Sequence, residues 1–194
     1  MLIAGKWVDS AAGEILMVEN PAHRTPIAEI PRGRAEDVDR AVKAAAEAYP
    51  AWSRVAPRER GKLFLKIADA LEARVEELAR LIALETGNAL RTQARPEASG
   101  TVEMFRYYGG LGGELKGETI PLGEHVLSYT RREPFGVVGA IVPWNAPSIL
   151  SAIKIAPALI AGNTMVLKAA EDAPLCVLLL AEVCQQFLPP GVLN

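Results

Sequence analysis

A strand–helix–strand pattern in residues 136–168 constrains the fold of this chain more than any other feature. It begins with the apolar, β-branched run "GVVGAIV", continues with the helical stretch "PSILSAIKIAPALIAG" and ends with a second strand, "TMVLK". A continuous β-branched run is typical of a parallel strand that is covered on both faces. The whole span has the size of a βαβ unit, about 30 residues. The sequence therefore predicts an α/β fold with a parallel sheet.

A further helix and a further strand are expected after residue 168. Asp172 is expected to cap this helix, with Pro174 in its first turn and the apolar run "LCVLLLAEVCQQFL" as its body. The residues "PPG" stop the helix, and "VLN" at residues 192–194 begins a third strand.

The N-terminal part of the chain is expected to carry short strands followed by three helices. Turn residues divide residues 1–33 into short strands. Apolar periodicity predicts helices over residues 35–49, over residues 57–87 and over about residues 94–111. The predicted apolar face of the first helix consists of Val38, Ala41, Val42, Ala45 and Tyr49.

Composition and charge exclude several classes of protein. With 50% hydrophobic residues and a net charge of -2, the chain has enough apolar material for a core and lacks the basic surface of a nucleic-acid-binding protein. Its most apolar region, residues 135–167, is interrupted by polar residues and several prolines, so we expect no membrane span. The N-terminus has no charged-then-apolar leader, so we expect no signal peptide.

The cysteines and histidines indicate a metal-free protein of a reducing compartment. Cys176 and Cys184 lie on one predicted helix, about 12 Å apart along its axis, which is too far for a disulfide. Free thiols suit a cytoplasmic protein. Neither His23 nor His125 has a cysteine, histidine or acidic neighbour at metal-ligand spacing, so we predict no metal site.

Two polar segments follow the predicted strands, at the edge of a parallel sheet where ligands bind. The first is "PWNAP", residues 143–147. Asn145 in this segment has two interpretations. Its side-chain amide could donate to a developing oxyanion beside a helix N-terminus, or it could be a plain helix N-cap.

The second segment is "KAAED", residues 168–172. An acid at the end of the second strand of a nucleotide-binding unit commonly binds ribose hydroxyls, which makes Glu171 a candidate with Lys168 beside it. A carboxylate there would repel a 2′-phosphate, so NAD is favoured over NADP. In the alternative interpretation both are surface residues next to a helix start. The usual G-x-G-x-x-G fingerprint is absent.

Three stretches resemble the aldehyde dehydrogenase superfamily in order and spacing: "EPFGVVGAIVPWNAP", "IKIAPALIAGNTMVLKAAEDAPL" and "LPPGVLN". They are similar to the start of that family's coenzyme domain. Two earlier stretches, "PAHRTPIAEIPRGRAEDVDRAVKAAAEAYPAW" and "LETGN", resemble its N-terminal region. The resemblance covers essentially the whole chain. It implies NAD-dependent oxidation of an aldehyde to a carboxylic acid on a Rossmann-like parallel sheet, which is incomplete here.

The resemblance also implies roles for individual residues. Asn145 would donate its side-chain amide to the oxyanion of a cysteine thiohemiacetal. Ile141, Val142, Pro143 and Trp144 would line the coenzyme cleft, Lys168 and Glu171 would hold the adenosine ribose, and Lys154 would lie near the active-site water path. Ala146 replaces the aromatic residue that is commoner after the asparagine, which alters the expected shape of the substrate tunnel.

The resemblance divides the chain into three parts and implies its partners. Residues 1–116 would hold the N-terminal strands and helices of the coenzyme domain, residues 117–135 an oligomerisation-type β-hairpin, and residues 136–194 the first half of the NAD-binding βαβ core. The implied partners are a small-molecule aldehyde and further copies of the chain in a homo-oligomer, with no nucleic acid and no membrane.

In this family a cysteine thiolate attacks the aldehyde, and a glutamate activates water to release the acid. Both residues lie in the family's second half, so we expect the 194-residue chain to be truncated before them and inactive alone. Cys176 and Cys184 are not expected to substitute, because each lies in an apolar helix without a nearby base. Two alternatives stay open. One is a non-catalytic interaction or assembly module that keeps half of the fold. The other is a relative that uses the fold for acyl transfer or for phosphate-activated substrates.

Overall fold

A pair of parallel strands lies at the centre of the computed structural model, which describes residues 1–194. Strand β7 (Val137–Ile141) pairs with β8 (Thr164–Lys168), and helix α5 (Pro147–Ile160) connects them. On the other edge of β8, the backbone N–H of Met165 donates to Val192 and Leu193 forms a parallel bridge to Met165. The predicted βαβ unit and third strand are therefore confirmed.

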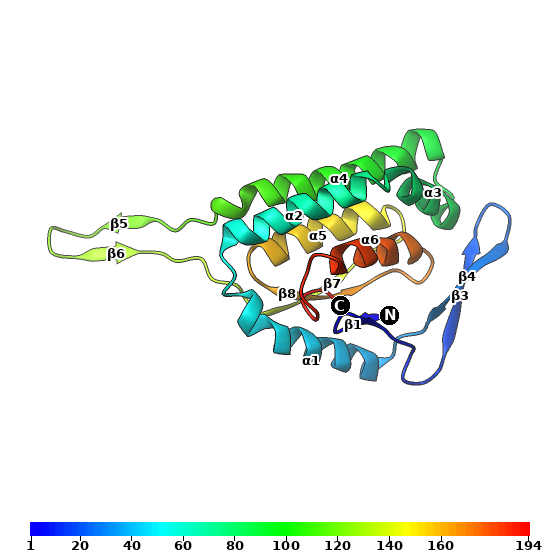
Figure 1. The fold of residues 1–194 in the computed structure, drawn as a ribbon, viewed down its shortest axis with the longest axis horizontal. Helices are drawn as coiled ribbons and strands as arrows, with labels where there is room; N and C mark the ends of the chain where they lie inside the picture. The colour runs from blue at the N-terminus through cyan, green and yellow to red at the C-terminus, as the bar shows by residue number, and fades with distance from the viewer.

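Helices pack on both faces of β8, whereas β7 is less well covered (Figure 1). The remaining helices are α1 (Ala35–Trp52), α2 (Pro57–Glu72), α3 (Val75–Thr86), α4 (Arg95–Gly110) and α6 (Leu175–Gln185). A π-helical turn at Leu90–Ala94 leads into α4, and a 3-10 turn at Leu111–Gly113 follows it. Helix α1 contacts β7 and β8 from one side, whereas α5 and α6 lie on the other side with α2 and α4 packed beyond α5. None of the helices combines the length and apolar character needed to cross a membrane.

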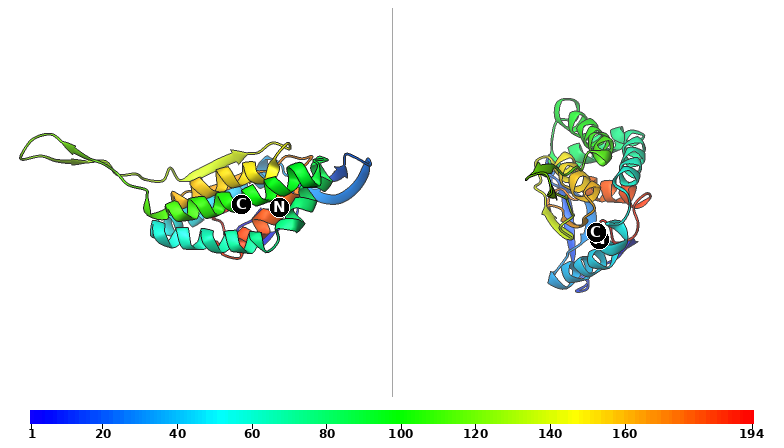
Figure 2. Two further views of the ribbon diagram at one scale, coloured as in Figure 1. Left: turned by 90° about the horizontal axis from the view of Figure 1, so that it is seen from above. Right: turned by 90° about the vertical axis from the view of Figure 1, so that its left-hand side faces the viewer.

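The other strands form three antiparallel pairs outside the central sheet. They are β1 (Leu2–Ile3) with β2 (Lys6–Trp7), β3 (Ile15–Asn20) with β4 (Thr25–Pro31), and β5 (Thr119–Pro121) with β6 (Leu127–Tyr129). The β3–β4 and β5–β6 hairpins project from opposite ends of the molecule, and the second extends far from the body (Figures 1 and 2). Both strands of this second hairpin lie within residues 117–135, where the resemblance implies a β-hairpin.

The prediction of one continuous helix over residues 57–87 is wrong, because the structure contains two helices there. Helix α2 ends at Glu72 and α3 begins at Val75. At the break, the side chain of Arg74 turns to Glu77 and Glu182, with N–O distances of 2.7 Å to each. Apolar periodicity did not reveal the break, because Leu71 and Leu78 on either side are both buried in the same core.

The apolar face predicted for the first helix is wrong in part. Val38 and Val42 are exposed, whereas Ala41, Ala44, Ala45 and Trp52 are buried. Small alanines let α1 approach the sheet closely enough for the hydroxyl of Thr164 to donate to the carbonyl oxygen of Ala45, at 2.8 Å. The close approach of backbones, rather than the largest apolar side chains, therefore decides which face of α1 is buried.

The expectation that strand β7 is covered on both faces is also wrong. Ala140 is buried, but Gly139 and Ile141 are exposed, and 75% of Ile141 is accessible to solvent. Strand β7 is an edge strand, since β8 is its only partner in residues 1–194. The apolar run at residues 136–142 is therefore partly exposed to solvent.

Glycines set the distance between helices α2 and α4, whose Phe64 and Phe105 rings stack with centroids 5.6 Å apart. A Cβ at Gly61 would lie 2.5 Å from the carbonyl oxygen of Gly109, and a Cβ at Gly112 would lie 2.6 Å from that of Pro57. Side chains at these positions would force the two backbones apart. The glycines at the end of α4 therefore serve close packing as well as helix termination.

We predict that Gly61→Ala destabilises the protein by about 1–3 kcal/mol, because the added methyl group meets a backbone oxygen that cannot move freely. Gly110→Ala is the matched control, since a Cβ there has no neighbour within 4 Å. The control should be neutral or stabilising by up to about 1 kcal/mol. Urea unfolding of both variants measures the difference, and equal free energies of unfolding would contradict the packing argument.

Candidate active site

The two polar segments predicted to bind a ligand leave the sheet side by side. Ile141 and Lys168 are opposite each other in the last register pair of β7 and β8. The backbone N–H of Val142 then donates to the carbonyl oxygen of Lys168 at 3.1 Å, which extends the pairing by one residue. Residues 143–147 and 168–172 therefore start from the same edge of the sheet, as a parallel arrangement requires.

The structure rules out one of the two interpretations of Asn145. Helix α5 has Ala146 at its N-cap position and has no side-chain cap of its own. Asn145 is exposed, and its side chain makes no hydrogen bond within the chain. The plain N-cap interpretation is therefore wrong, and the Asn145 amide is available to a ligand.

A buried carboxylate from helix α4 caps helix α5 instead. Glu97, which is 9% exposed, accepts hydrogen bonds on Oε1 from the backbone N–H groups of Ser148 at 2.9 Å and Ile149 at 3.4 Å. The hydroxyl groups of Thr101 and Ser148, 2.8 Å apart, join the same two helices. The helix that begins directly after Asn145 is thus anchored to α4.

Helix α6 is capped in the same way from helix α3. Glu85, which is 3% exposed, accepts from the backbone N–H groups of Leu175 at 2.5 Å and Cys176 at 2.9 Å. The expected cap, Asp172, is exposed and makes no such bond, and Pro174 occupies the N-cap position. The prediction that Asp172 caps this helix is wrong because a carboxylate far away in the sequence supplies the acceptor.

Burial raises the pKa of both capping carboxyl groups. For Glu85 and for Glu97, removal from water is the largest effect, and the backbone donors at the helix N-termini oppose it. The negative charge of Glu85 raises the pKa of Glu97 further. The starts of α5 and α6 are therefore each held by a buried carboxyl group from another helix.

Lys168 and Glu171 form an ion pair on the surface of the second segment. Lys168 Nζ lies 2.7 Å from Glu171 Oε1, with 55% and 60% of the two side chains exposed. The hydrogen bond from Lys168 lowers the pKa of the Glu171 carboxyl group. An ionised carboxylate and an ammonium group are thus presented together at the sheet edge.

The other predicted site residues differ in exposure. Ile141, Pro143 and Trp144 are exposed at the end of β7, whereas Val142 is 2% exposed and packs in the core. Lys154 is exposed in the middle of α5 and makes no ion pair. The structure therefore brings Asn145, Lys168 and Glu171 to one edge, with Lys154 further along the helix that starts there.

The two thiols are unsuited to attack on a substrate. Cys176 and Cys184 are free and fully buried. Burial raises the pKa of both thiols, and the nearby Glu85 carboxylate raises that of Cys176 further. A thiol in such surroundings is rarely ionised, so it is a poor nucleophile.

Sequence reasoning missed Glu85, Glu97 and Asn88. The stretch "LETGN" contains Glu85 and Asn88, but its resemblance to a family assigns no contact to either residue. The side-chain amide of Asn88 donates to the carbonyl oxygen of Asn145 at 3.2 Å. No local pattern around Glu97 marked it as a capping residue, since its partners are about 50 residues away.

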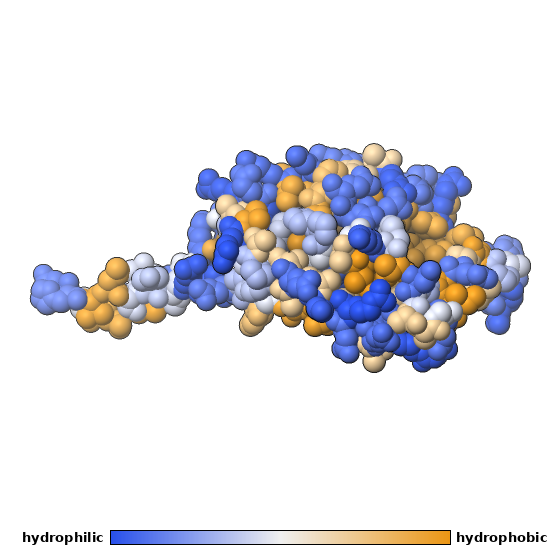
Figure 3. All heavy atoms as spheres, turned by 60° about the horizontal axis from the view of Figure 1, so that its bottom comes forward, coloured by the Kyte–Doolittle hydropathy of each residue, from blue (hydrophilic) through white to orange (hydrophobic).

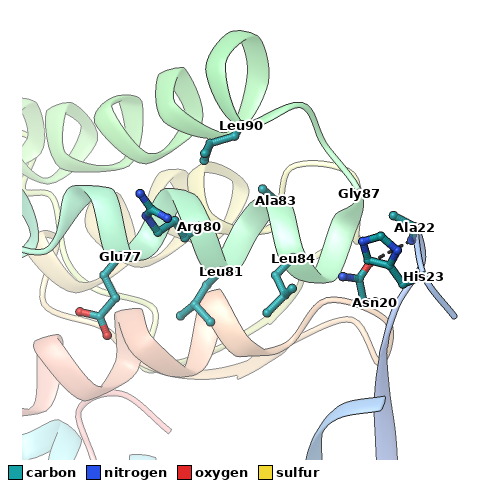
Figure 4. Close-up of a pocket in the computed structure, with 10 residues that line it drawn as sticks. All are labelled: Asn20, Ala22, His23, Glu77, Arg80, Leu81, Ala83, Leu84, Gly87 and Leu90. Atoms are coloured by element: carbon teal, nitrogen blue, oxygen red, sulfur yellow. Dashed lines mark hydrogen bonds between the residues drawn. The ribbon is translucent and has the colours of Figure 1, made fainter. Parts of the chain in front are cut away.

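A surface groove away from this edge has no converging catalytic groups. It is an open groove of about 790 Å³ between the turn of the β3–β4 hairpin and helix α3 (Figure 4). Asn20 accepts a hydrogen bond from Ala22, Glu77 pairs with Arg74, and Arg80 pairs with Glu76. Because neighbouring residues already occupy these groups, we do not assign the groove as the active site.

Comparisons with known proteins agree on one family. The model of the aldehyde dehydrogenase family matches residues 7–194. The chain is 41% identical over 192 residues to an acetaldehyde dehydrogenase of Pseudomonas aeruginosa, covering 99% of the chain and 38% of the relative. It is 43% identical over 203 residues to a phenylacetaldehyde dehydrogenase of Pseudomonas fluorescens, covering all of the chain and 40% of the relative.

Solved structures give the same result. PnpE from Pseudomonas sp. WBC-3, in complex with nicotinamide adenine dinucleotide, superposes with a TM-score of 0.96 at 42% identity. The NAD+ complex of an aldehyde dehydrogenase from Bacillus cereus superposes with a TM-score of 0.97 at 41% identity. Each comparison covers 100% of this chain and 40% of the other chain. The chain thus spans about two fifths of the length of these relatives.

We predict that Glu97→Ala destabilises the protein by about 2–4 kcal/mol, because it leaves the two backbone donors at the start of α5 without an acceptor. Glu103→Ala is the control on the same helix, since Glu103 is exposed and pairs only with Arg106. The control should cost less than about 1 kcal/mol. Thermal and urea unfolding measure both, and a loss for Glu97→Ala as small as the control's would refute the capping role.

We predict a pH dependence for Glu85→Gln. The raised pKa of Glu85 means that the folded protein binds this proton more tightly than the unfolded chain does. The contribution of Glu85 to stability is therefore present at low pH and is lost as pH rises through the raised pKa. As pH rises above about 4.5, the stability of Glu85→Gln relative to the parent should rise, and it should level off once the pH exceeds the raised pKa of Glu85.

Glu77→Gln is the control for this titration. Glu77 is on the same helix, but the hydrogen bond from Arg74 lowers its pKa. Its contribution is lost as pH falls, so the difference from the parent should have the opposite sign and be small at this exposed site. Urea unfolding across the pH range measures both slopes, and parallel slopes for the two variants would contradict the assignment.

Proposed function

The chain belongs to the aldehyde dehydrogenase family, and we propose that it serves in the NAD-dependent oxidation of an aldehyde to a carboxylic acid. One observation carries this proposal. The two segments that resemble the family's coenzyme and oxyanion motifs, residues 143–147 and 168–172, meet at the carboxyl edge of the parallel strands. This edge is where nucleotides bind in open α/β sheets.

The residues at the edge fit the adenosine half of NAD. Lys168 and Glu171 offer a donor and an acceptor side by side, which suits a pair of ribose hydroxyl groups. The lowered pKa keeps Glu171 ionised at neutral pH, and its charge would repel the additional phosphate of NADP. NAD, when bound, supplies a hydride acceptor. Two relatives solved with this nucleotide support the proposal.

Asn145 is proposed as the oxyanion donor. Its amide is exposed next to the N-terminus of α5 and has no partner within the chain. A fixed N–H donor at this place would stabilise the negative charge that develops on the aldehyde oxygen when a thiolate attacks. The aldehyde carbon would then lie close to the sheet edge and to the coenzyme.

The neighbouring residues would support the coenzyme. Ile141, Pro143 and Trp144 present an exposed apolar surface beside Lys168, which suits the apolar faces of a dinucleotide. Val142 would act from within the core, by holding the end of β7 in place. Lys154, exposed on α5, is proposed to lie near the path of the active-site water.

Neither cysteine of residues 1–194 is suited to act as the nucleophile of this reaction. Cys176 and Cys184 are buried, and their thiols have raised pKa values. We therefore propose that these residues alone are inactive and that the attacking cysteine and the general base belong to sequence beyond them.

The projecting hairpin is proposed to join copies of the chain in a homo-oligomer. Behind its polar tip, apolar atoms lie on its surface (Figure 3). Leu122, Leu127 and Tyr129 are 63%, 80% and 67% exposed, which is unusual for apolar side chains without a partner.

We also propose that the chain has the three parts expected from its sequence. They are a coenzyme-domain region over residues 1–116, this hairpin over residues 117–135, and the NAD-binding core over residues 136–194. Two free buried thiols favour a cytoplasmic protein.

We predict NADH formation from NAD and an aldehyde by the protein expressed from its complete reading frame, but not by residues 1–194 alone. Absorbance with a panel of aliphatic, aromatic and semialdehyde substrates measures it. Asn145→Ala should lower kcat by about 10²- to 10³-fold, because one oxyanion donor is removed. The KM for NAD should stay close to that of the parent, since Lys168 and Glu171 are unchanged.

Two results would contradict the proposal. Turnover by residues 1–194 alone would show that one of the two buried cysteines, or another group within these 194 residues, can act as the nucleophile. No turnover of any aldehyde by the complete protein would favour the alternative of a non-catalytic assembly module.

A further inference from the structure

We propose that Asn88 is a positioning residue for Asn145. The side-chain Nδ2 of Asn88 donates a hydrogen bond to the backbone carbonyl oxygen of Asn145, 3.2 Å away. This inference rests on the proposed role of Asn145 as oxyanion donor. It adds a residue from the end of α3 to the machinery at the sheet edge.

The segment that carries Asn145 is fixed at both ends. At its start, the N–H of Val142 binds the carbonyl oxygen of Lys168. At its end, Glu97 holds the N–H groups of Ser148 and Ile149. Between these anchors, residues 143–146 make one hydrogen bond to another part of the chain, and it comes from Asn88. No other hydrogen bond from outside helix α5 therefore fixes the peptide groups of this turn.

Asn88 is itself held on a rigid support. Its backbone N–H donates to Thr86 Oγ1 at 3.1 Å, and that hydroxyl donates to the carbonyl oxygen of Ile82 at 2.6 Å. Gly87 between them adopts a left-handed conformation with φ 76° and ends α3 with a hydrogen bond to Ala83. Three residues before Asn88, Glu85 binds the start of α6. The donor to Asn145 thus projects from a well-anchored helix end.

The carbonyl group and the side chain of Asn145 share one Cα atom. With Ala146 and Pro147 fixed by the start of α5, the direction of the carbonyl group restricts the backbone angles of Asn145. These angles in turn set where the Cβ and the side-chain amide point. An oxyanion donor has to be held within about 0.5 Å of its productive place. Loss of the Asn88 contact would therefore weaken catalysis through Asn145, without removing a group that touches the substrate.

A merely structural role for Asn88 would give a different result. The hydrogen bond is exposed to solvent, so its removal should alter the stability of the fold little. The effect should be concentrated on the step in which Asn145 acts. The loss of kcat caused by removing the Asn88 side chain should also disappear in a variant that lacks the Asn145 amide, because Asn88 then has no oxyanion donor to position.

The test uses the protein from its complete reading frame and the variants Asn88→Ala and Asn88→Asp, which both lack the donor. We expect kcat for aldehyde oxidation to fall by about 10-fold or more, with the KM for NAD within about 2-fold and the unfolding midpoint unchanged. In an Asn145→Ala background, Asn88→Ala should cause no further loss of kcat. The control is Gln186→Ala, since Gln186 is an exposed amide at the end of α6 that donates to Glu182 and lies away from the site. It should match the parent.

Amide hydrogen exchange over residues 143–149 gives an independent readout. It should become faster in Asn88→Ala and stay the same in Gln186→Ala. An unchanged kcat with unchanged exchange would overturn the inference, and so would an equal loss of kcat in both backgrounds. If the parent does not oxidise aldehydes, the proposed function fails. Exchange alone then decides whether Asn88 positions the turn.

Discussion

Two buried carboxylates hold the starts of the two helices that follow the sheet edge. Glu85 and Glu97 each accept hydrogen bonds from two backbone N–H groups, at the starts of α6 and α5. Burying a carboxylate costs free energy, and the N-terminus of a helix is one of the few partners that offsets it with several donors at once. Because each of these helices follows one of the two segments at the sheet edge, the carboxylates fix where both segments end.

A buried cation acts at the opposite end of α5. Arg60, 3% exposed, donates from Nε to the carbonyl oxygen of Ile160 at 2.9 Å, also binds the carbonyl oxygen of Val55, and lies 5.9 Å from the ring of Trp52. Helix α5 therefore has a carboxylate at its N-terminus and a guanidinium at its C-terminus, as its dipole favours. The N-terminal helices α2, α3 and α4 thus hold both ends of α5 and the start of α6 in place.

The sequence was sufficient for those features that depend on local pattern. The βαβ unit, the third strand beside β8, and the grouping of Asn145 with Lys168 and Glu171 at one edge followed from strand order and strand ends. The caps did not, because Glu85 and Leu175 are 90 residues apart and nothing near either residue signals the contact. The break between α2 and α3 was hidden for another reason: Leu71 and Leu78 keep the apolar period while Arg74 turns the chain. The buried face of α1 was misjudged because close backbone approach favoured alanines over Val38 and Val42.

In the proposed function, residues 143–147 and 168–172 together form the coenzyme edge of an aldehyde dehydrogenase. The most direct measurement is a crystal structure of the protein from its complete reading frame, soaked with NAD. We expect the adenosine ribose within hydrogen-bonding distance of Lys168 and Glu171, with the dinucleotide running past Trp144 towards Asn145. A nucleotide bound instead in the groove beside α3, or contacts that avoid both segments, would contradict it.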